Sequence, residues 1–154
     1  MKTYLFAYGS LINPESLRKT LPGDHETSPI VLKGYKRVMN FPYEGYAYLN
    51  VVANEQSAVT GVRIALTDEE FDILAKREVG YVRTDVTEHI AGPFEGTVYA
   101  YIAPNVPCEF KTPLSYLMTC TRGMTNEERA AWINDTVIGE IEDDLEKPVY
   151  NNYA

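Results

Sequence analysis

The chain has 154 residues, of which 45% are hydrophobic, and 22 Asp and Glu residues against 14 Lys and Arg residues give a formal net charge of −8. This length suits one domain with a real core, and the negative charge would repel a phosphate backbone, so nucleic acid is not expected as a partner. The N-terminus lacks signal-peptide features and no apolar stretch approaches the roughly 20 residues of a membrane span, so we expect a soluble cytoplasmic protein that does not enter a membrane.

The first predicted element is a strand over residues 3–8, which are almost continuously apolar or aromatic, as in a strand covered on both faces. Asn13 as N-cap and Pro14 in the first turn then predict a short helix over residues 14–20. Residues 9–12 connect the two elements, so unpaired backbone N–H groups at the helix N-terminus could bind a carboxylate or phosphate. A plain strand-to-helix turn explains the same residues.

Three further strands are expected over residues 30–39, 46–53 and 59–66, because turn-forming residues separate these stretches. Thr67 and the acidic residues after it form a capping box, which predicts a second helix that Gly80 should end.

Glu78 is the candidate catalytic residue of this second helix. The inward stripe of Phe71, Leu74 and Ala75 places Glu78 on the same face. Burial and the negative end of the helix dipole should both raise the pKa of its carboxyl, as a general acid or base near neutrality requires. Two alternatives stay open: a frayed last turn that exposes Glu78 to water, or a buried ion pair with Arg83.

The next stretch, residues 81–90, alternates like a half-buried strand, and residues 97–103 predict another strand. Tyr81 and Arg83 share the less apolar face of the first of these and are candidates for ligand contact. More often such a pair simply covers a sheet with its polar ends in water.

Two helices are expected late in the chain, one from residue 112 to 123 and one after the capping box that begins at Thr125. About six strands and four helices without a regular βαβ rhythm predict an α+β fold that is mostly antiparallel. A small closed or nearly closed β-barrel would remove the exposed sheet edges. We expect one domain over residues 1–139 and an acidic tail over residues 140–154, either docked or mobile.

The number and spacing of the cysteines and histidines indicate neither a metal site nor a disulfide. Cys108 and Cys120 form no CxxC pair, and two histidines are too few for a histidine-rich metal site. Tyr116 shares a helical face with Cys120 and is expected in the core, unless its hydroxyl points into a pocket. Residues 41–46 are interpreted as a surface turn, with a loop beside the pocket as the alternative.

Five motifs in order, FAYGSL, LKGYKR, GVRIAL, LAKREVGYVRTDV and PLSYLMTCTRG, make residues 3–123 resemble the gamma-glutamylcyclotransferase-like family in its small-domain branch. The resemblance implies a small β-barrel with flanking helices, a tight loop that holds a glutamyl group through its backbone amides, and Glu78 as the acid/base. Tyr116 matches a pocket-lining tyrosine of the family. With Tyr81 and Arg83 added from the strand pattern, the candidate substrate-binding residues are Tyr8, Gly9, Ser10, Leu11, Tyr81, Arg83 and Tyr116.

The resemblance implies a cyclotransferase, of transferase or lyase type, that needs no metal or cofactor. The α-amine of a small γ-glutamyl amine or peptide attacks its own γ-carbonyl, which gives 5-oxoproline and a free amine. Because both reacting groups lie in one molecule, holding them in a reactive geometry supplies much of the acceleration. The alternatives are a non-catalytic domain that binds a carboxylate metabolite and a protein-interaction module. The leaving amine and the oligomeric state are left open.

Overall fold

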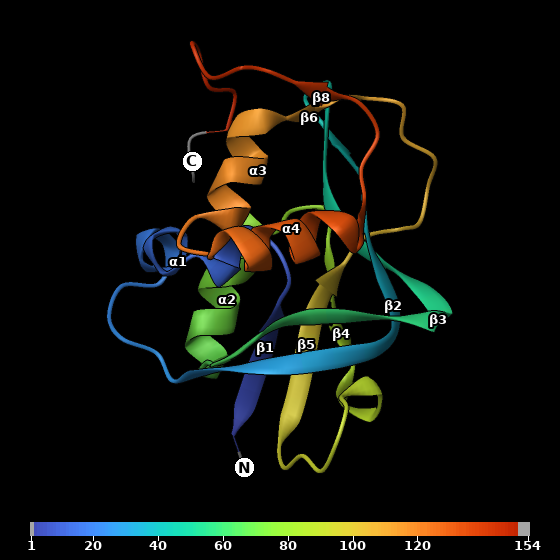
Figure 1. Cartoon of the computed structure of the whole chain (residues 1–154). Helices are drawn as coiled ribbons and strands as arrows, with labels where there is room; N and C mark the ends of the chain where they lie inside the picture. The colour runs from blue at the N-terminus through green and yellow to red at the C-terminus, as the bar shows by residue number, and fades with distance from the viewer. Residues whose placement is uncertain (1, 151–154) are drawn as a thin grey trace.

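The computed structural model describes residues 2–150, and within them four α-helices surround a mixed six-stranded sheet (Figure 1). The expected α+β class is confirmed. In chain order the elements are β1 (Thr3–Ala7), the 3-10 helix η1 (Ser10–Ile12), α1 (Pro14–Thr20), β2 (Thr27–Tyr43), β3 (Tyr46–Ala65), α2 (Asp68–Arg77), β4 (Val82–Asp85), the 3-10 helix η2 (Thr87–His89), β5 (Thr97–Ile102), β6 (Thr112–Pro113), α3 (Leu114–Thr121), α4 (Asn126–Asn134), β7 (Thr136–Val137) and β8 (Ile141–Glu142).

The main sheet has the strand order β4–β5–β1–β3–β2–β7. Three pairings, β1–β3, β2–β3 and β4–β5, are antiparallel, whereas β1–β5 and β2–β7 are parallel. Within residues 2–150 the sheet is not closed, because β4 and β7 form two separate edges, so the expected barrel is not confirmed. An isolated bridge between Leu32 and Ile90 brings β2 close to the chain after β4 without forming a ladder. The long β2–β3 hairpin curves across the molecule (Figure 1).

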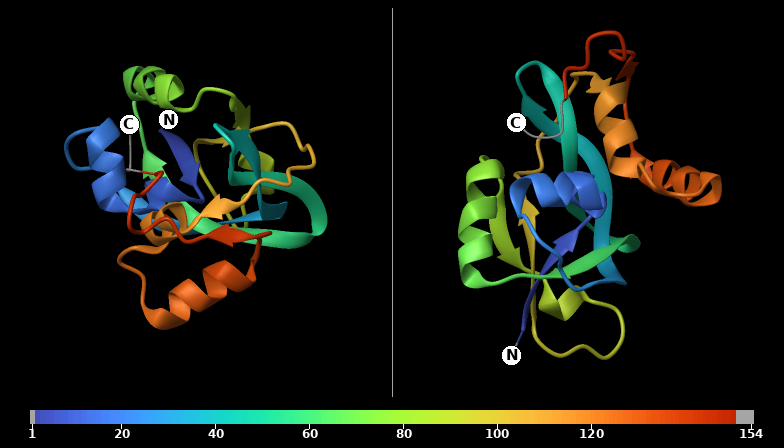
Figure 2. Two further views of the ribbon diagram at one scale, coloured as in Figure 1. Left: turned by 90° about the horizontal axis from the view of Figure 1, so that it is seen from above. Right: turned by 90° about the vertical axis from the view of Figure 1, so that its left-hand side faces the viewer.

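The central strand β1 is buried on both faces, as its apolar sequence predicts. Tyr4 and Phe6 point into a core shared with α3 and α4, whereas Leu5 and Ala7 point into a second core shared with α1 and α2. This alternation is the period of two that a strand imposes on its side chains. β1 therefore delivers the chain after Ala7 to a place between two pairs of helices (Figure 2).

The helix ends follow the local capping signals. Asn13 caps α1 and accepts from the N–H of Glu15 at 2.9 Å. Thr67 and Thr125 each form a complete capping box with the glutamate three residues later, at the start of α2 and α4. These three helices begin where the sequence predicts, since each signal lies within a few residues of the bonds that it makes.

The expected separate strands over residues 46–53 and 59–66 are in fact one strand, β3. Its pairing with β2 shifts register where residues 54–57 stand opposite Gly34, which has a φ of +80°. The polar residues 54–57 therefore form an exposed irregularity in a continuing strand rather than a chain reversal. Val51 and Val59, before and after it, are both fully buried in the same core.

The expected strand over residues 81–90 is also corrected, because β4 ends at Asp85. The Asp85 carboxylate accepts from the N–H of Thr87 at 3.0 Å and from its hydroxyl at 2.6 Å. Such a local side-chain turn competes with strand pairing, and the 3-10 helix η2 follows it.

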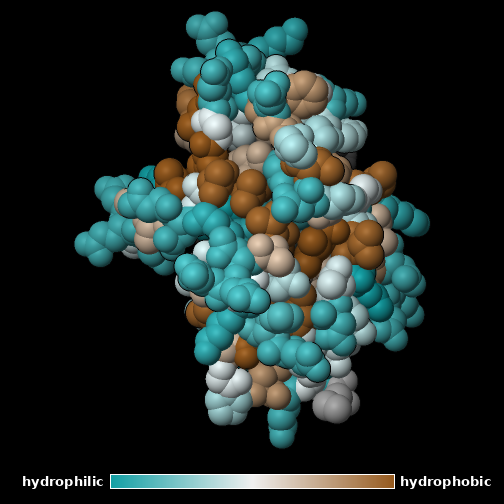
Figure 3. Space-filling model, turned by 90° about the vertical axis from the view of Figure 1, so that its right-hand side faces the viewer, coloured by the Kyte–Doolittle hydropathy of each residue, from teal (hydrophilic) through white to brown (hydrophobic). Residues whose placement is uncertain are grey.

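No helix formed by residues 2–150 is both long and apolar enough to span a membrane. Figure 3 shows one face of the molecule, where apolar residues gather across the middle and hydrophilic side chains surround them. Tyr43, Val106 and Phe110 are among the large side chains of the structure that are 40% or more exposed.

Candidate functional site

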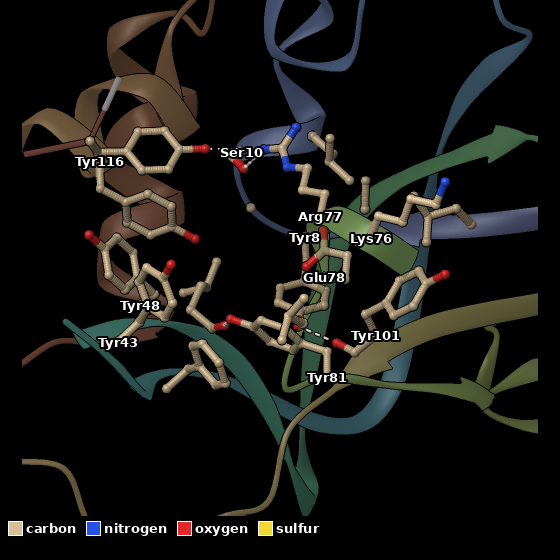
Figure 4. A pocket seen from close by; sticks show the side chains of 18 of the residues that line it. Tyr8, Ser10, Tyr43, Tyr48, Lys76, Arg77, Glu78, Tyr81, Tyr101 and Tyr116 are labelled. Carbon is tan, nitrogen blue, oxygen red and sulfur yellow. Dashed lines mark hydrogen bonds between the residues drawn. The ribbon is translucent and has the colours of Figure 1, made fainter. Parts of the chain in front are cut away.

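A pocket of about 610 Å³ opens where several segments of the chain meet. Its walls come from the turn after β1, the C-terminal end of α2, the tip of the β2–β3 hairpin, α3 and the C-terminal segment (Figure 4). A volume of this size is typical of small-molecule sites. Both parts of the sequence singled out as candidates, the turn and the end of the second helix, lie on it.

The turn between β1 and α1 supplies Tyr8, Gly9, Ser10 and Leu11 to the pocket wall. Helix η1 begins there, and the N–H of Ile12 donates to the carbonyl of Gly9 at 3.0 Å. The first N–H groups of a helix have no acceptor inside it, so the start of η1 presents donors beside the pocket.

Gly9 packs closely against side chains of β3 and α3. A methyl group added at Gly9 would lie 2.8 Å from Cδ2 of Leu49 and 3.4 Å from the hydroxyl of Tyr116. The first distance is shorter than real Cβ contacts allow, so a larger residue would displace the turn or the Leu49 side chain. The turn therefore approaches β3 and α3 as closely as glycine permits.

Glu78 is the C-cap residue of α2, and its N–H donates to the carbonyl of Leu74 at 3.0 Å. Its side chain is half-buried and lines the pocket (Figure 4). Burial raises the pKa of the Glu78 carboxyl above its usual value, and the positive charge of Arg77 acts in the opposite direction. Glu78 takes part in no ion pair within residues 2–150, so the alternative of a buried pair with Arg83 is not observed.

Tyr8 and Tyr81 line the pocket with their hydroxyl groups already engaged. Tyr8 donates to the carbonyl of Tyr101 at 2.5 Å, and Tyr81 donates to the carbonyl of Leu49 at 2.6 Å. Burial and the nearby negative charge of Glu78 raise the pKa of Tyr8 well above its usual value, so it stays a neutral phenol. These two side chains are fixed walls of the pocket.

Tyr116 comes from α3 and reaches the pocket from the side opposite to α2. Its ring packs edge-on against Tyr48 and Tyr150, each with a centroid separation of 4.9 Å. Burial raises its pKa well above the usual value for tyrosine. The buried Cys120 on the same helix has its pKa raised to about 12 by burial, so it is a neutral thiol.

Arg83 is the one candidate residue that the structure does not bring to the pocket. Its guanidinium lies over the rings of Phe71 and Tyr99, at 4.6 and 4.4 Å from their centroids. The inward stripe of α2 also needs a correction, because Ala75 is exposed while Phe71 and Leu74 are buried.

Arg77 is a pocket residue that the sequence did not single out. One guanidinium nitrogen, Nη2, donates to the hydroxyls of Ser10 at 2.9 Å, Ser16 at 3.3 Å and Tyr150 at 3.1 Å. The other, Nη1, donates to the hydroxyl of Thr20 at 2.8 Å. A basic residue in the last turn of a helix is ordinary, so no pattern in the sequence signals this role.

The tip of the β2–β3 hairpin also reaches the pocket, through Tyr43 and Glu44. This tip was interpreted as a surface turn, and the structure instead favours the alternative of a loop beside the pocket. Glu44 has a φ of +48° and Gly45 a φ of +85°, as a tight two-residue hairpin turn requires.

The C-terminal segment docks beside α3 through Asp144. The Asp144 carboxylate accepts from the N–H of Ser115 at 2.9 Å, from the Ser115 hydroxyl at 2.5 Å and from the N–H of Val149 at 2.7 Å. Burial alone would raise the pKa of Asp144, but these hydrogen bonds outweigh it and lower the pKa. The segment so held places Tyr150 at the pocket, whereas the rest of the expected tail, residues 151–154, lies outside the described residues.

Metal ligands do not gather in the described part of the chain. Within residues 2–150, no group of three or more His, Cys, Asp and Glu side chains is placed to hold a metal ion. Cys108 and Cys120 are free thiols.

Comparison with known proteins gives a family and a fold. Residues 5–117 match the sequence model of the family described as gamma-glutamyl cyclotransferase, AIG2-like. No curated protein matches the chain significantly. An uncharacterized protein from Homo sapiens has a similar structure, with a TM-score of 0.70 at 16% identity, over 94% of this chain and 96% of that one.

Two further solved structures are similar. One, named gamma-glutamyl cyclotransferase, has a TM-score of 0.69 at 16% identity over 95% of this chain and 96% of its own. YkqA from Bacillus subtilis has a TM-score of 0.71 at 20% identity, over 90% of this chain and 56% of YkqA. At these identities the likeness establishes the fold.

Proposed function

The chain belongs to the gamma-glutamyl cyclotransferase, AIG2-like family, and from this premise we propose that it converts a small γ-glutamyl amine or peptide to 5-oxoproline and a free amine. The observation that carries the proposal is that Glu78 and the 8–11 turn line one pocket of about 610 Å³. Such a pocket accommodates a ligand of the size of a γ-glutamyl amine or dipeptide.

In this reaction the substrate supplies both nucleophile and electrophile. The α-ammonium first loses a proton, and the freed amine attacks the γ-carbonyl carbon to close a five-membered ring, after which the attacking nitrogen gives a second proton to water. The bond between this carbon and the leaving nitrogen then breaks, and that nitrogen takes up a proton and leaves as the neutral amine. Holding the substrate in a folded, reactive conformation is the main task of the enzyme, since effective molarities of well-oriented intramolecular reactions reach about 10⁵–10⁸ M.

Glu78 is assigned the first and the last of these proton transfers. Its carboxylate accepts the proton from the α-ammonium group and its acid form returns one to the leaving nitrogen. The upward shift of its pKa by burial supports this role, because a carboxyl that titrates closer to neutrality exchanges protons more readily in both directions. Its half-buried position in the pocket wall makes the carboxylate accessible to a ligand.

The turn that contains Gly9 and Ser10 is assigned the stabilisation of negative charge on the substrate. Backbone N–H groups at the start of η1 are suited to the γ-carbonyl oxygen, which becomes negative when the amine adds, or to the α-carboxylate. Tyr8, Tyr81 and Tyr116 are assigned to shaping the pocket, since two of their hydroxyls are engaged with backbone carbonyls.

The test is an assay of 5-oxoproline formation by mass spectrometry across a panel of γ-glutamyl amines and dipeptides. Turnover by the wild-type protein, lost in a Glu78→Gln protein that is at least as stable to heat, is the expected result. Full activity of Glu78→Gln would remove Glu78 from the mechanism. Protection from heat by a panel member without any turnover would instead favour a domain that binds a carboxylate metabolite.

A further inference from the structure

Arg77 has an unusual environment for a cation in a pocket. Its five hydrogen bonds all go to neutral oxygen atoms, namely three hydroxyls of η1 and α1, the backbone carbonyl of Ser16 and the hydroxyl of Tyr150. Within residues 2–150 it makes no ion pair, although the whole chain carries a formal charge of −8. A guanidinium forms its strongest hydrogen bonds with anionic oxygens, so this arrangement lacks its best partner.

The hydrogen bonds also fix the guanidinium in place. Ser16 and Thr20 hold it from α1, and Ser10 holds it from the turn that forms the pocket wall. Lys76, the other pocket-lining cation, is exposed. Arg77 is therefore the preorganised positive charge of the pocket, and a ligand would not have to order it on binding.

Tyr150 occupies the side of Arg77 that faces α3. Its hydroxyl accepts from Nη2 of Arg77 at 3.1 Å, while its ring packs against the rings of Tyr116 and Tyr48. Burial raises the pKa of Tyr150 and the charge of Arg77 opposes the rise, so the partner of Arg77 here is a neutral phenol. A carboxylate oxygen in the place of this hydroxyl would replace a neutral hydrogen bond by a charge-assisted one.

We propose that Arg77, together with the hydroxyl of Ser10, binds the α-carboxylate of the γ-glutamyl group, and that the hydroxyl of Tyr150 holds this position until the substrate displaces it. The proposal rests on the proposed function for the identity of the ligand. It leaves the N–H groups at the start of η1 for the γ-carbonyl oxygen. It also makes Arg77 a specificity residue, since γ-glutamyl compounds whose α-carboxylate is blocked would bind poorly.

Binding is measured by calorimetry in the Glu78→Gln protein, so that no turnover interferes. The probes are L-γ-glutamyl methylamide and its analogue with a carboxamide in place of the α-carboxylate. We expect the carboxylate form to bind about 30-fold more tightly, as loss of a hydrogen bond to a charged group implies. Adding Arg77→Gln should remove most of this preference, Arg77→Lys should keep part of it, and Tyr150→Phe should tighten binding of the carboxylate form several-fold.

Arg18→Gln is the matched control, because it removes the same charge from the exposed side of α1 and should leave the preference unchanged. If Arg77→Gln fails to fold, the carboxylate preference of Arg77→Lys and the binding of the carboxylate form by Tyr150→Phe test the inference instead. An unchanged preference in Arg77→Gln, or unchanged binding in Tyr150→Phe, overturns the inference.

The wild-type assay separates this inference from the proposed function. Turnover by the wild-type protein with no effect of Arg77 on carboxylate preference rejects the role of Arg77 and leaves the cyclotransferase in place. Arg77-dependent binding without turnover rejects the cyclotransferase and keeps the role of Arg77. A protein that shows no binding of the probes and no turnover of the panel would contradict both the role of Arg77 and the cyclotransferase activity.

Discussion

Arg77 donates a hydrogen bond to the hydroxyl of Ser10 at 2.9 Å, across 67 positions of the sequence. This bond joins the last turn of α2 to the turn after β1. Glu78 follows Arg77 directly, so the same bond sets the position of the acidic side chain relative to the 8–11 turn. The chemistry proposed for the pocket depends on that relative position.

Replacing Glu78 by glutamine should lower the rate of 5-oxoproline formation by about 10²–10⁴-fold, the range that general acid–base groups contribute. The amide has nearly the same shape but cannot exchange the proton. Glu69→Gln is the matched control, since it makes the same change at an exposed position of the same helix and should retain full activity. Equal losses in both variants would point to a disturbed helix and contradict the assignment.

Glu78 should also make the wild-type protein less stable as the pH rises. Because burial raises its folded-state pKa above the unfolded value of about 4.3, the folded protein binds more protons in the interval between them. Stability is therefore lost as the pH rises through this interval. Glu78→Gln should match the wild-type melting temperature at about pH 4 or below and exceed it at pH 8. A difference that stays constant with pH would contradict a raised pKa.

Gly9→Ala should destabilise the protein by about 1–3 kcal/mol, as overpacking typically does, and raise KM. The added methyl would lie 2.8 Å from Cδ2 of Leu49, so the turn or the buried Leu49 side chain has to move. Gly139→Ala is the control, because a methyl there has no heavy atom within 4 Å. Urea unfolding and steady-state kinetics measure the two effects, and wild-type behaviour of Gly9→Ala would show that the turn tolerates displacement.

Asp144→Asn should cost about 1.5–3 kcal/mol of the free energy of unfolding at pH 7, the range for hydrogen bonds to charged groups. Three donors surround the carboxylate, and the asparagine amide nitrogen can accept from none of them. Because the folded-state pKa of Asp144 is lowered, its contribution is present above its unfolded pKa of about 3.9 and is lost as the pH falls through the folded value.

The difference between Asp144→Asn and the wild type should therefore shrink on acidification, as urea unfolding at a series of pH values would show. Glu146→Gln, at an exposed position two residues later, is the control and should change little. A loss no larger than that of the control would mean that the C-terminal segment contributes little to stability.

The sequence was most informative where the determining contacts are local. The caps at Asn13, Thr67 and Thr125 were predicted because the capping side chain and the N–H that it binds lie within three residues. The position of Glu78 followed from helical periodicity and the apolar residues before it. Its placement opposite the 8–11 turn, however, needed the family resemblance as well as the pattern.

Long-range relations were the ones that the sequence did not reveal. The expected break in β3 was wrong because the polar residues 54–57 resemble a turn. In the structure β2 pairs with β3 on both sides of Gly34, so the strand continues through these residues. Arg77 and Tyr150 meet at the pocket only through tertiary contacts, and neither has a neighbour in sequence that signals the role. Arg83 was misplaced because alternation along a strand identifies a face but not what covers it.

The β2–β3 hairpin has one end in the sheet and the other at the pocket. Near its base, β3 pairs with β1 through residues 62–65, whereas its tip carries Tyr43 and Glu44 on the pocket rim. The tip closes through its own two-residue turn, and its residues do not pair with β1. If the proposed function holds, an engineer could therefore exchange the tip to redesign which leaving amines are accepted, while Glu78, the residue proposed for proton transfer, and the strand order stay as they are.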